Sequence, residues 1–274
     1  MLAPRLLLNR ALAAGTALLL VTVLASCSSG GDEPASTGNA STPKAAKPSA
    51  TAVETKSTDV VALAMNADGM LGGNATVTDY PAGEPGVLSV VETAPLEDND
   101  SLGSVLPIVF RNNTDATVSH VDIAGTARGA DGALAATGSS QGTVPAQVPS
   151  GGLGLAYIYF EGEPPAGDAT YEFTFETIEA DTSSYNTASL KVTEAALSGS
   201  AIVGTAVNGN DATVTGPYSV AVYCFDDAGK LLSYTSAFAD QDDDQASGAQ
   251  VSFSADLYDA PCPTFRVGVA GYFA

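Results

Sequence analysis

The chain contains a single histidine, His120, in the stretch VSHVDIAG. A Ser-His-Asp arrangement for nucleophilic catalysis would have to use this residue as its base. Alternation along the stretch places His120 on one face with Val118 and Asp122, opposite Val121 and Ile123. Because the apolar face of such a strand is normally buried, we expect His120 to be a surface residue without a catalytic role.

A second candidate for chemistry is the acidic stretch ADQDDDQASG, whose carboxylates are Asp240, Asp242, Asp243 and Asp244. Acids at 240, 242 and 244 have the spacing that opens an EF-hand calcium loop. That loop then requires glycine and glutamate where this chain has Gln245 and Val251, so the motif fails. A looser calcium site using loop carbonyls and a solvated loop extended by its like charges are the two alternatives. We expect no metal and no cofactor, with Asp240, Asp242 and Asp244 as weak candidates.

Cys27 is the third reactive side chain, at the end of an apolar run. Arg5 and Arg10 precede the run from Ala11 to Ala25, and LASC ends it. The run is too short to span a bilayer but suits a signal peptide. LASC resembles the lipobox of bacterial lipoproteins, and the resemblance implies that Cys27 receives a diacylglyceryl group and becomes the first mature residue. Two acyl chains would give stable anchoring at the cell membrane, on its extracytoplasmic face. The alternative is an ordinary secretory signal, residues 1–26, followed by an unrelated cysteine.

With Cys27 assigned to lipid, the other two cysteines, Cys224 and Cys262, form an even pair. Outside the membrane a disulfide is the usual state of such a pair. Two free thiols and a metal site with two cysteine ligands are the alternatives. A zinc site needs four ligands, and no histidine is close to either cysteine in sequence.

The elements that would position these residues follow a low-complexity segment, 27–57, rich in Ser, Thr, Ala, Gly and Pro. Such a segment cannot bury enough apolar surface to fold, so we interpret it as a disordered tether. From residue 58 onward the chain has 28 acidic side chains against five basic ones. This balance argues against nucleic-acid binding and against docking on anionic lipid. It favours either solubility through self-repulsion or a cationic partner, such as another envelope protein.

The part beyond the tether contains an internal repeat. LSVVETAPL (88–96) resembles LKVTEAAL (190–197), RNNTDATV (111–118) resembles VNGNDATV (207–214), and ARGADGAL (127–134) resembles CFDDAGKL (224–231). Matches in the same order indicate two copies of one unit. We assign 58–182 to the first module, with 58–85 unplaced, and 183–274 to the second. The predicted strands are 88–93, 106–111, 118–128, 153–160 and 171–175, then 190–195, 201–207, 218–225, 251–254 and 265–272.

Short strands separated by turns of Asn, Asp and Gly predict an all-β fold of two tandem antiparallel sandwiches. SAIVGTAVNGNDATVTGPYSVAVYCFDDAGKLL resembles the FxLyD-type module, and Phe225, Asp226 and Gly229 fit the tail of its pattern. The first copy departs from the pattern, with Arg128 in place of Phe225 and no cysteine pair. The resemblance implies immunoglobulin-like sandwiches on an extracytoplasmic bacterial protein and supplies no catalytic residues. We therefore expect a non-catalytic binding or structural role at the envelope, with a hydrolase or a calcium-stabilised adhesive module as alternatives.

Overall fold

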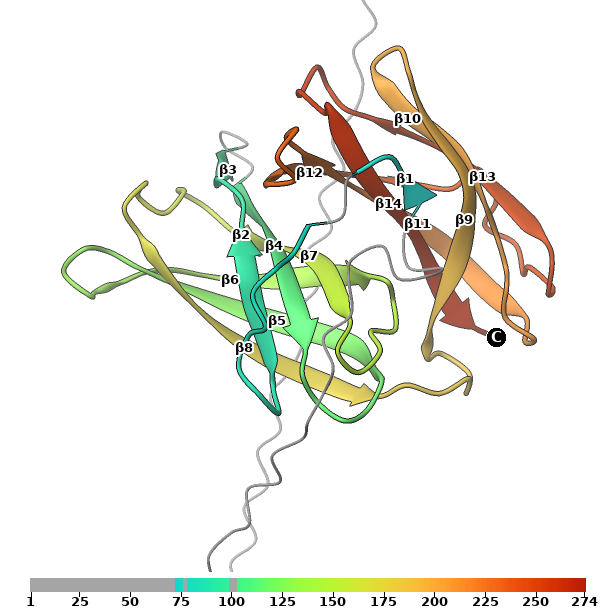
Figure 1. The fold of residues 1–274 in the computed structure, drawn as a ribbon, viewed down its shortest axis with the longest axis horizontal. Coiled ribbons are helices and arrows are strands. Elements are labelled where there is room, and N and C mark those ends of the chain that lie inside the picture. Colours follow the sequence, from blue (N-terminus) through green and yellow to red (C-terminus); the bar gives the residue numbers. More distant parts are fainter. Residues whose placement is uncertain (1–71, 76–77, 99–102) are drawn as a thin grey trace, which may run out of the picture. The chain divides into compact units, whose positions relative to one another are not determined.

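Alternating apolar and polar residues form antiparallel strands throughout the part of the chain that the structure describes. The structure is a computed structural model and describes residues 72–75, 78–98 and 103–274 (Figure 1). These residues contain strands and no helix, and they belong to one unit, residues 53–274. The predicted all-β fold of two tandem antiparallel sandwiches is confirmed. The predicted signal peptide, Cys27 and the tether lie outside the described residues.

The first copy of the repeat is one antiparallel sheet of seven strands that curls on itself. Its strand order is β2-β4-β7-β6-β5-β8, with the short β3 added to β4. The bounds are β2 (Leu88–Thr93), β3 (Glu97–Asp98), β4 (Ser104–Asn112), β5 (Val118–Arg128), β6 (Leu134–Val144), β7 (Leu153–Phe160) and β8 (Thr170–Glu179). A core forms inside the curl because alternate residues point inward, among them Leu106, Ile108, Phe110 and Ile158, all of which are buried.

The second copy has the order β12-β11-β14-β9-β10-β13, with the short β1 paired to β14. The bounds are β1 (Gly72–Gly73), β9 (Thr187–Ser198), β10 (Ala201–Val207), β11 (Val214–Phe225), β12 (Leu231–Phe238), β13 (Gln250–Asp256) and β14 (Thr264–Phe273). Its core includes Ile202, Val220, Val222 and Val267, which have no exposed surface. Gly72 and Gly73 belong to the segment left unplaced by the sequence, and they add a strand to the second copy.

The two copies share one circular strand order. Matching β2, β4, β5, β6, β7 and β8 to β9, β10, β11, β12, β13 and β14 converts one cycle into the other. The cycles open at different places. In the first copy β8 and β2 do not pair with each other. The matching strands β14 and β9 pair from Val269↔Leu190 to Tyr272↔Thr187. In the second copy β12 and β13 form no continuous ladder and meet at the bridge Ala239↔Phe253 and at the hydrogen bond from the Thr235 hydroxyl to the Asp256 carbonyl. The matching β6 and β7 pair from Gly138↔Phe160 to Val144↔Leu155.

Two buried asparagines confirm the sequence repeat at the level of hydrogen bonds. Asn112 donates from its side-chain amide to the carbonyls of Ala116 (2.8 Å) and Val148 (2.9 Å). Asn208 donates in the same way to Ala212 and Gln245, both at 2.9 Å. In both copies the amide oxygen accepts a main-chain N–H two residues later, at 3.0 Å. The run N-x-x-DATV is therefore a framework element that ties one turn to a neighbouring loop.

Cys224 and Cys262 form a disulfide, with their Cα atoms 4.9 Å apart. Cys224 lies near the end of β11, and Cys262 lies two residues before β14. These two strands already pair at this end, where Cys224 is opposite Phe265. The bond therefore closes a loop that carries β12 and β13.

Candidate ligand cleft between the two sandwiches

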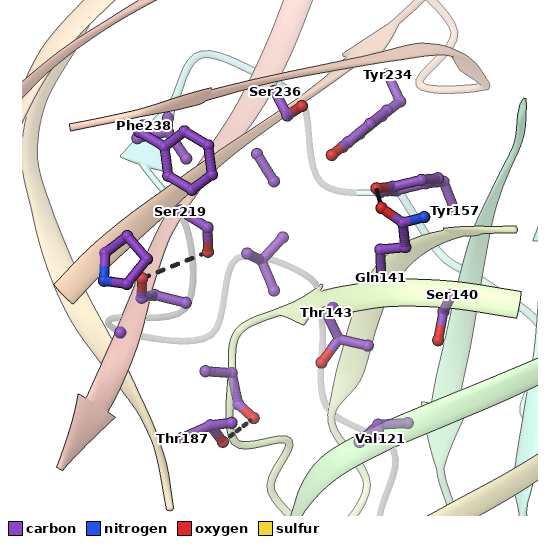
Figure 2. Close-up of a pocket in the computed structure, with 18 of the residues that line it drawn as sticks. Val121, Ser140, Gln141, Thr143, Tyr157, Thr187, Ser219, Tyr234, Ser236 and Phe238 are labelled. Atoms are coloured by element: carbon purple, nitrogen blue, oxygen red, sulfur yellow. Dashed lines mark hydrogen bonds between the residues drawn. The ribbon is translucent and has the colours of Figure 1, made fainter. Parts of the chain in front are cut away.

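A cleft of about 690 Å³ lies where β5, β6 and β7 of the first copy meet β11, β12 and β14 of the second. Figure 2 shows Ser219, Ser236 and Phe238 on one side of the open space and Ser140 and Thr143 on the other. The wall therefore combines side chains that are far apart in the sequence. It exists only because the two copies pack together.

Irregular strands shape this cleft. The pairing register shifts between Ser119 and Asp122 in β5, between Ser140 and Thr143 in β6, and between Thr215 and Ser219 in β11. Residues within all three irregularities line the cleft: His120, Val121, Gln141, Gly142 and Pro217. Bulges re-aim side chains and are common beside functional sites. Three of them converging on one cavity mark it as the leading candidate site among the described residues.

The lining is uncharged apart from Asp122, although the chain as a whole carries a net charge of −21. Its polar groups are mostly hydroxyls, from Ser140, Thr143, Tyr157, Thr187, Ser219, Tyr234, Ser236 and Tyr272. Aromatic surface is available beside them, because Phe238 is 66% exposed and Tyr272 is 39% exposed. Hydroxyls both donate and accept hydrogen bonds, so this wall suits a neutral ligand that does the same.

His120 lies on the wall of this cleft and is half-buried. The predicted alternation holds, with Val121 and Ile123 buried and Asp122 exposed, whereas Val118, which was expected on the same face as His120, is buried. His120 has a φ of 45°, in the left-handed region. Its Nε2 lies 3.1 Å from the carbonyl oxygen of Tyr185, and its ring centroid lies 6.5 Å from that of Tyr272.

Three residue types needed for a hydrolytic triad line the same cleft, namely His120, Asp122 and Ser140. The Ser140 hydroxyl accepts the main-chain N–H of Ile123 at 2.9 Å, and the His120 ring contacts a main-chain carbonyl. Each of these two polar side chains is therefore engaged with the backbone. These two contacts join His120 and Ser140 to main-chain groups and not to each other.

The acidic stretch from Asp240 to Asp244 forms a loop away from this cleft lining. The Asp240 carboxylate accepts the Ser252 hydroxyl at 2.8 Å. The Tyr218 hydroxyl lies 2.8 Å from the carbonyl oxygens of both Asp243 and Val214. Within residues 72–75, 78–98 and 103–274, no three His, Cys, Asp or Glu side chains are grouped so as to hold a metal ion, and this includes Asp240, Asp242 and Asp244.

Two glutamates of the first copy hold β12 against it and thereby form one edge of the cleft. Glu92 accepts the main-chain N–H of Leu231, and Glu97 accepts that of Tyr234, both at 2.9 Å. The Tyr234 ring stacks on Tyr157 of the first copy, with centroids 4.1 Å apart. Burial raises the pKa of the Glu97 carboxyl to about 7, although the hydrogen bond from Tyr234 opposes the shift. Burial also raises the pKa of Glu92.

Glu97→Gln is expected to remove a pH dependence from this contact. The folded pKa of about 7 exceeds the ordinary value of 4.5, so the contribution of Glu97 to stability is complete below pH 4.5 and is lost as the pH rises to 7. The glutamine oxygen accepts the same N–H without ionising. The variant should match the parent below pH 4.5 and be more stable above pH 7, by about 1–2 kcal/mol after allowance for solvent screening.

Chemical denaturation across this pH range measures the effect. Glu176→Gln is the matched control, because Glu176 is an exposed carboxylate on β8. The control should follow the parent at every pH. An equal stability difference for Glu97→Gln at all pH values would contradict the assignment.

Sequence reasoning missed most of the cleft. It named His120 but did not delimit β6 or β12, which supply Ser140, Gln141, Thr143, Tyr234, Ser236 and Phe238. It also missed two buried arginines. Arg111 donates to the carbonyls of Pro81, Gly151 and Tyr80 at 3.2, 2.9 and 3.3 Å, and Arg266 donates to that of Ala75. Arginine is rare in the folded part of this acidic chain. An arginine within a predicted strand could therefore have been taken as a sign that its side chain has a buried, structural role.

The described residues contain no helix long and apolar enough to cross a membrane. No protein-family model, curated protein or solved structure matches the chain. The cleft geometry is therefore the main support for a function.

Proposed function

We propose that this chain is a lipid-anchored extracytoplasmic protein of a bacterial envelope that binds a neutral, hydroxyl-rich ligand without catalysis. A glycan segment has this chemistry. The lipobox-like LASC with Cys27 supports the anchor, and the acidic, lysine-poor folded part supports a location away from nucleic acid and anionic lipid. The cleft between the two sandwiches is the proposed binding site.

The observation that carries the proposal is the contrast between the cleft and the rest of the protein. Hydroxyls and aromatic rings line the cleft, and Asp122 is its single formally charged residue. Ligand sites combine aromatic surface with a few well-placed polar groups. A neutral polyol can exchange hydrogen bonds with the serine and threonine hydroxyls while its C–H faces pack on Phe238 and Tyr272.

Binding is favoured over hydrolysis by the hydrogen bonds of the cleft. A general base must reach the proton that it removes. His120 instead contacts the Tyr185 carbonyl, and the Ser140 hydroxyl accepts the Ile123 N–H. The hydrolase alternative therefore has a histidine in the right cavity but no activated nucleophile beside it.

Phe238→Ala and Tyr272→Ala are expected to weaken glycan binding about tenfold each, because aromatic anchors carry much of the energy of such sites. The full chain is titrated with linear neutral oligosaccharides of glucose and of N-acetylglucosamine. The corresponding oligomer of galacturonic acid serves as a charged comparison and should bind more weakly.

Tyr258→Ala is the matched control, because Tyr258 is 81% exposed and does not line the cleft. It should leave the affinity unchanged. Equal losses for all three variants, or no binding of either neutral oligomer, would count against the proposed site. Release of shorter sugars during the titration would show that the protein is an enzyme.

Cys27→Ala is expected to abolish lipid attachment, because no thiol remains at the end of the leader to accept the diacylglyceryl group. Metabolic labelling with an alkyne fatty acid, followed by membrane fractionation, measures the result. The variant should be unlabelled, and it should be either released or retained as an uncleaved precursor. Ser28→Ala is the control and should be labelled normally. Normal labelling of Cys27→Ala would end the anchor proposal.

A further inference from the structure

The opening between β2 and β8 in the first copy leaves part of its core accessible. A groove of about 560 Å³ lies there, lined by residues of β2, by Glu84 and by Tyr171, Phe173 and Phe175 of β8. Leu88, Val90 and these three aromatic residues pack on the core of the first copy but are only partly buried. The core of the first copy is therefore incompletely covered where these two strands fail to meet.

The second copy shows what fills the matching position. Its strands β14 and β9 pair over Val269 to Tyr272, and farther along β14 the segment β1 pairs instead, as Gly72↔Val267 and Gly73↔Arg266. β1 also contacts β9, and Figure 1 shows it beside both strands. Main-chain N–H groups of Asn74 and Ala75 donate to the carbonyl of Phe265 at 3.2 and 3.0 Å.

This added segment completes the second core. Phe265 and Val267 of β14, beside β1, are 2% and 0% exposed. Gly73 lies so close to the Phe265 carbonyl and ring that a Cβ atom would overlap them, and its φ is 115°. In the second copy the fold thus accepts an extended segment between β14 and β9. The first copy is open at the matching position, where the edge of β8 that faces β2 has no strand partner.

The chemistry of the groove defines what it would accept. On β8 the inward residues Tyr171, Phe173 and Phe175 alternate with the exposed Glu172, Thr174 and Glu176. Glu84 and Glu92 are the charged residues that line the groove and both are acidic, with the Glu92 carboxylate already accepting the main-chain N–H of Leu231. Glu172 is paired with Arg128 at 2.9 Å, but both side chains are solvent-accessible, so this pair offsets little of the acidity.

We propose that the β2–β8 groove binds an extended, cationic segment of a partner protein by strand addition. Apolar residues at alternate positions face Phe173, Phe175 and Val90, and the intervening lysines or arginines face outward beside Glu176. Main-chain hydrogen bonds to the free edge of β8 supply affinity, and the alternation supplies specificity. This inference uses a different surface from the ligand cleft and goes beyond the proposed function.

Two synthetic peptides of equal composition test the proposal on the full chain. Lys-Val-Lys-Val-Lys-Val-Lys has the required alternation, and Lys-Lys-Val-Val-Val-Lys-Lys does not. Because their charges are equal, non-specific attraction to the acidic protein is the same for both. The alternating peptide should bind about tenfold more tightly, and hydrogen exchange should slow in β2 and β8.

Two pairs of variants localise the effect. Phe173→Ala should remove most of the preference for alternation, whereas Leu134→Ala, at a 62% exposed position on β6, should keep it. Glu176→Lys should weaken binding of the alternating peptide about threefold more than Asp211→Lys, which makes the same change of charge in the second copy. Thermal melts show whether each variant is folded. If Phe173→Ala does not fold, Glu176→Lys still tests the groove.

Three results would overturn the proposal. Equal affinity for the two peptides would show simple charge attraction. A homodimer that the alternating peptide does not dissociate would assign the groove to a second copy of the chain. Peptide binding that appears only after deletion of residues 58–65 would assign it to that segment of the chain itself.

Discussion

Replacing both Cys224 and Cys262 by alanine is expected to lower the free energy of unfolding by about 4 kcal/mol in the chain-entropy account of disulfides. The bond closes a loop with a sequence separation of 38 that carries β12 and β13. Without the bond, the unfolded second copy gains the freedom of this loop. Chemical denaturation of the double variant measures the loss, which should act mainly on the second copy because the first has no cysteine.

Reduction of the parent protein provides the matched comparison. A reductant should shift the parent toward the double variant and leave the variant itself unchanged. Tyr234 of β12 stacks on Tyr157 of the first copy. If β12 detaches when the disulfide is removed, this stacking is lost and the residues that line the cleft become more exposed to solvent. Unchanged stability of the double variant would contradict the role assigned to the bond.

Asn208→Ala is expected to cost about 3 kcal/mol, because the substitution removes several buried hydrogen bonds, each with a net contribution of about 1 kcal/mol. The side chain has no exposed surface and donates to Ala212 and Gln245 while it accepts the N–H of Asn210. Alanine leaves the Ala212 carbonyl and the Asn210 N–H without this partner, whereas the Gln245 carbonyl keeps the main-chain N–H of Val214. Asn112→Ala should cost a similar amount, since the same bonds recur in the first copy.

Asp211→Ala is the control for Asn208→Ala, because Asp211 is an exposed neighbour in the same turn. It should change the free energy of unfolding by less than about 0.5 kcal/mol. Similar losses for both positions would mean that the turn is sensitive to any change and that the asparagine bonds are not special.

The fold was largely predictable because its signals are local. Strands 88–93, 118–128, 153–160 and 201–207 are observed with the predicted bounds. The asparagine turns were predicted from their composition, and the structure adds the reason why the residue is asparagine. β6 was not delimited because LAATGSSQGTV contains few large apolar residues and includes a bulge.

The cleft could not be predicted, because it depends on how two sequence-distant surfaces meet. The bulges in β5, β6 and β11 bring side chains to the cleft, and alternation in the sequence gives no indication of where they occur. Nothing in the sequence distinguishes Glu92 and Glu97 from the other acidic residues of a strongly charged chain. Their role emerges only when the free N–H groups of β12 lie against them.

The two copies share the order of strands around the cycle but differ in the position of the open joint. A cyclic arrangement of six strands can be cut at any joint without changing which strand follows which in the chain. One copy is cut between β8 and β2, and the other is weakly joined between β12 and β13. The same chain order of strands is therefore compatible with openings at two different joints, and each copy presents a different pair of strand edges.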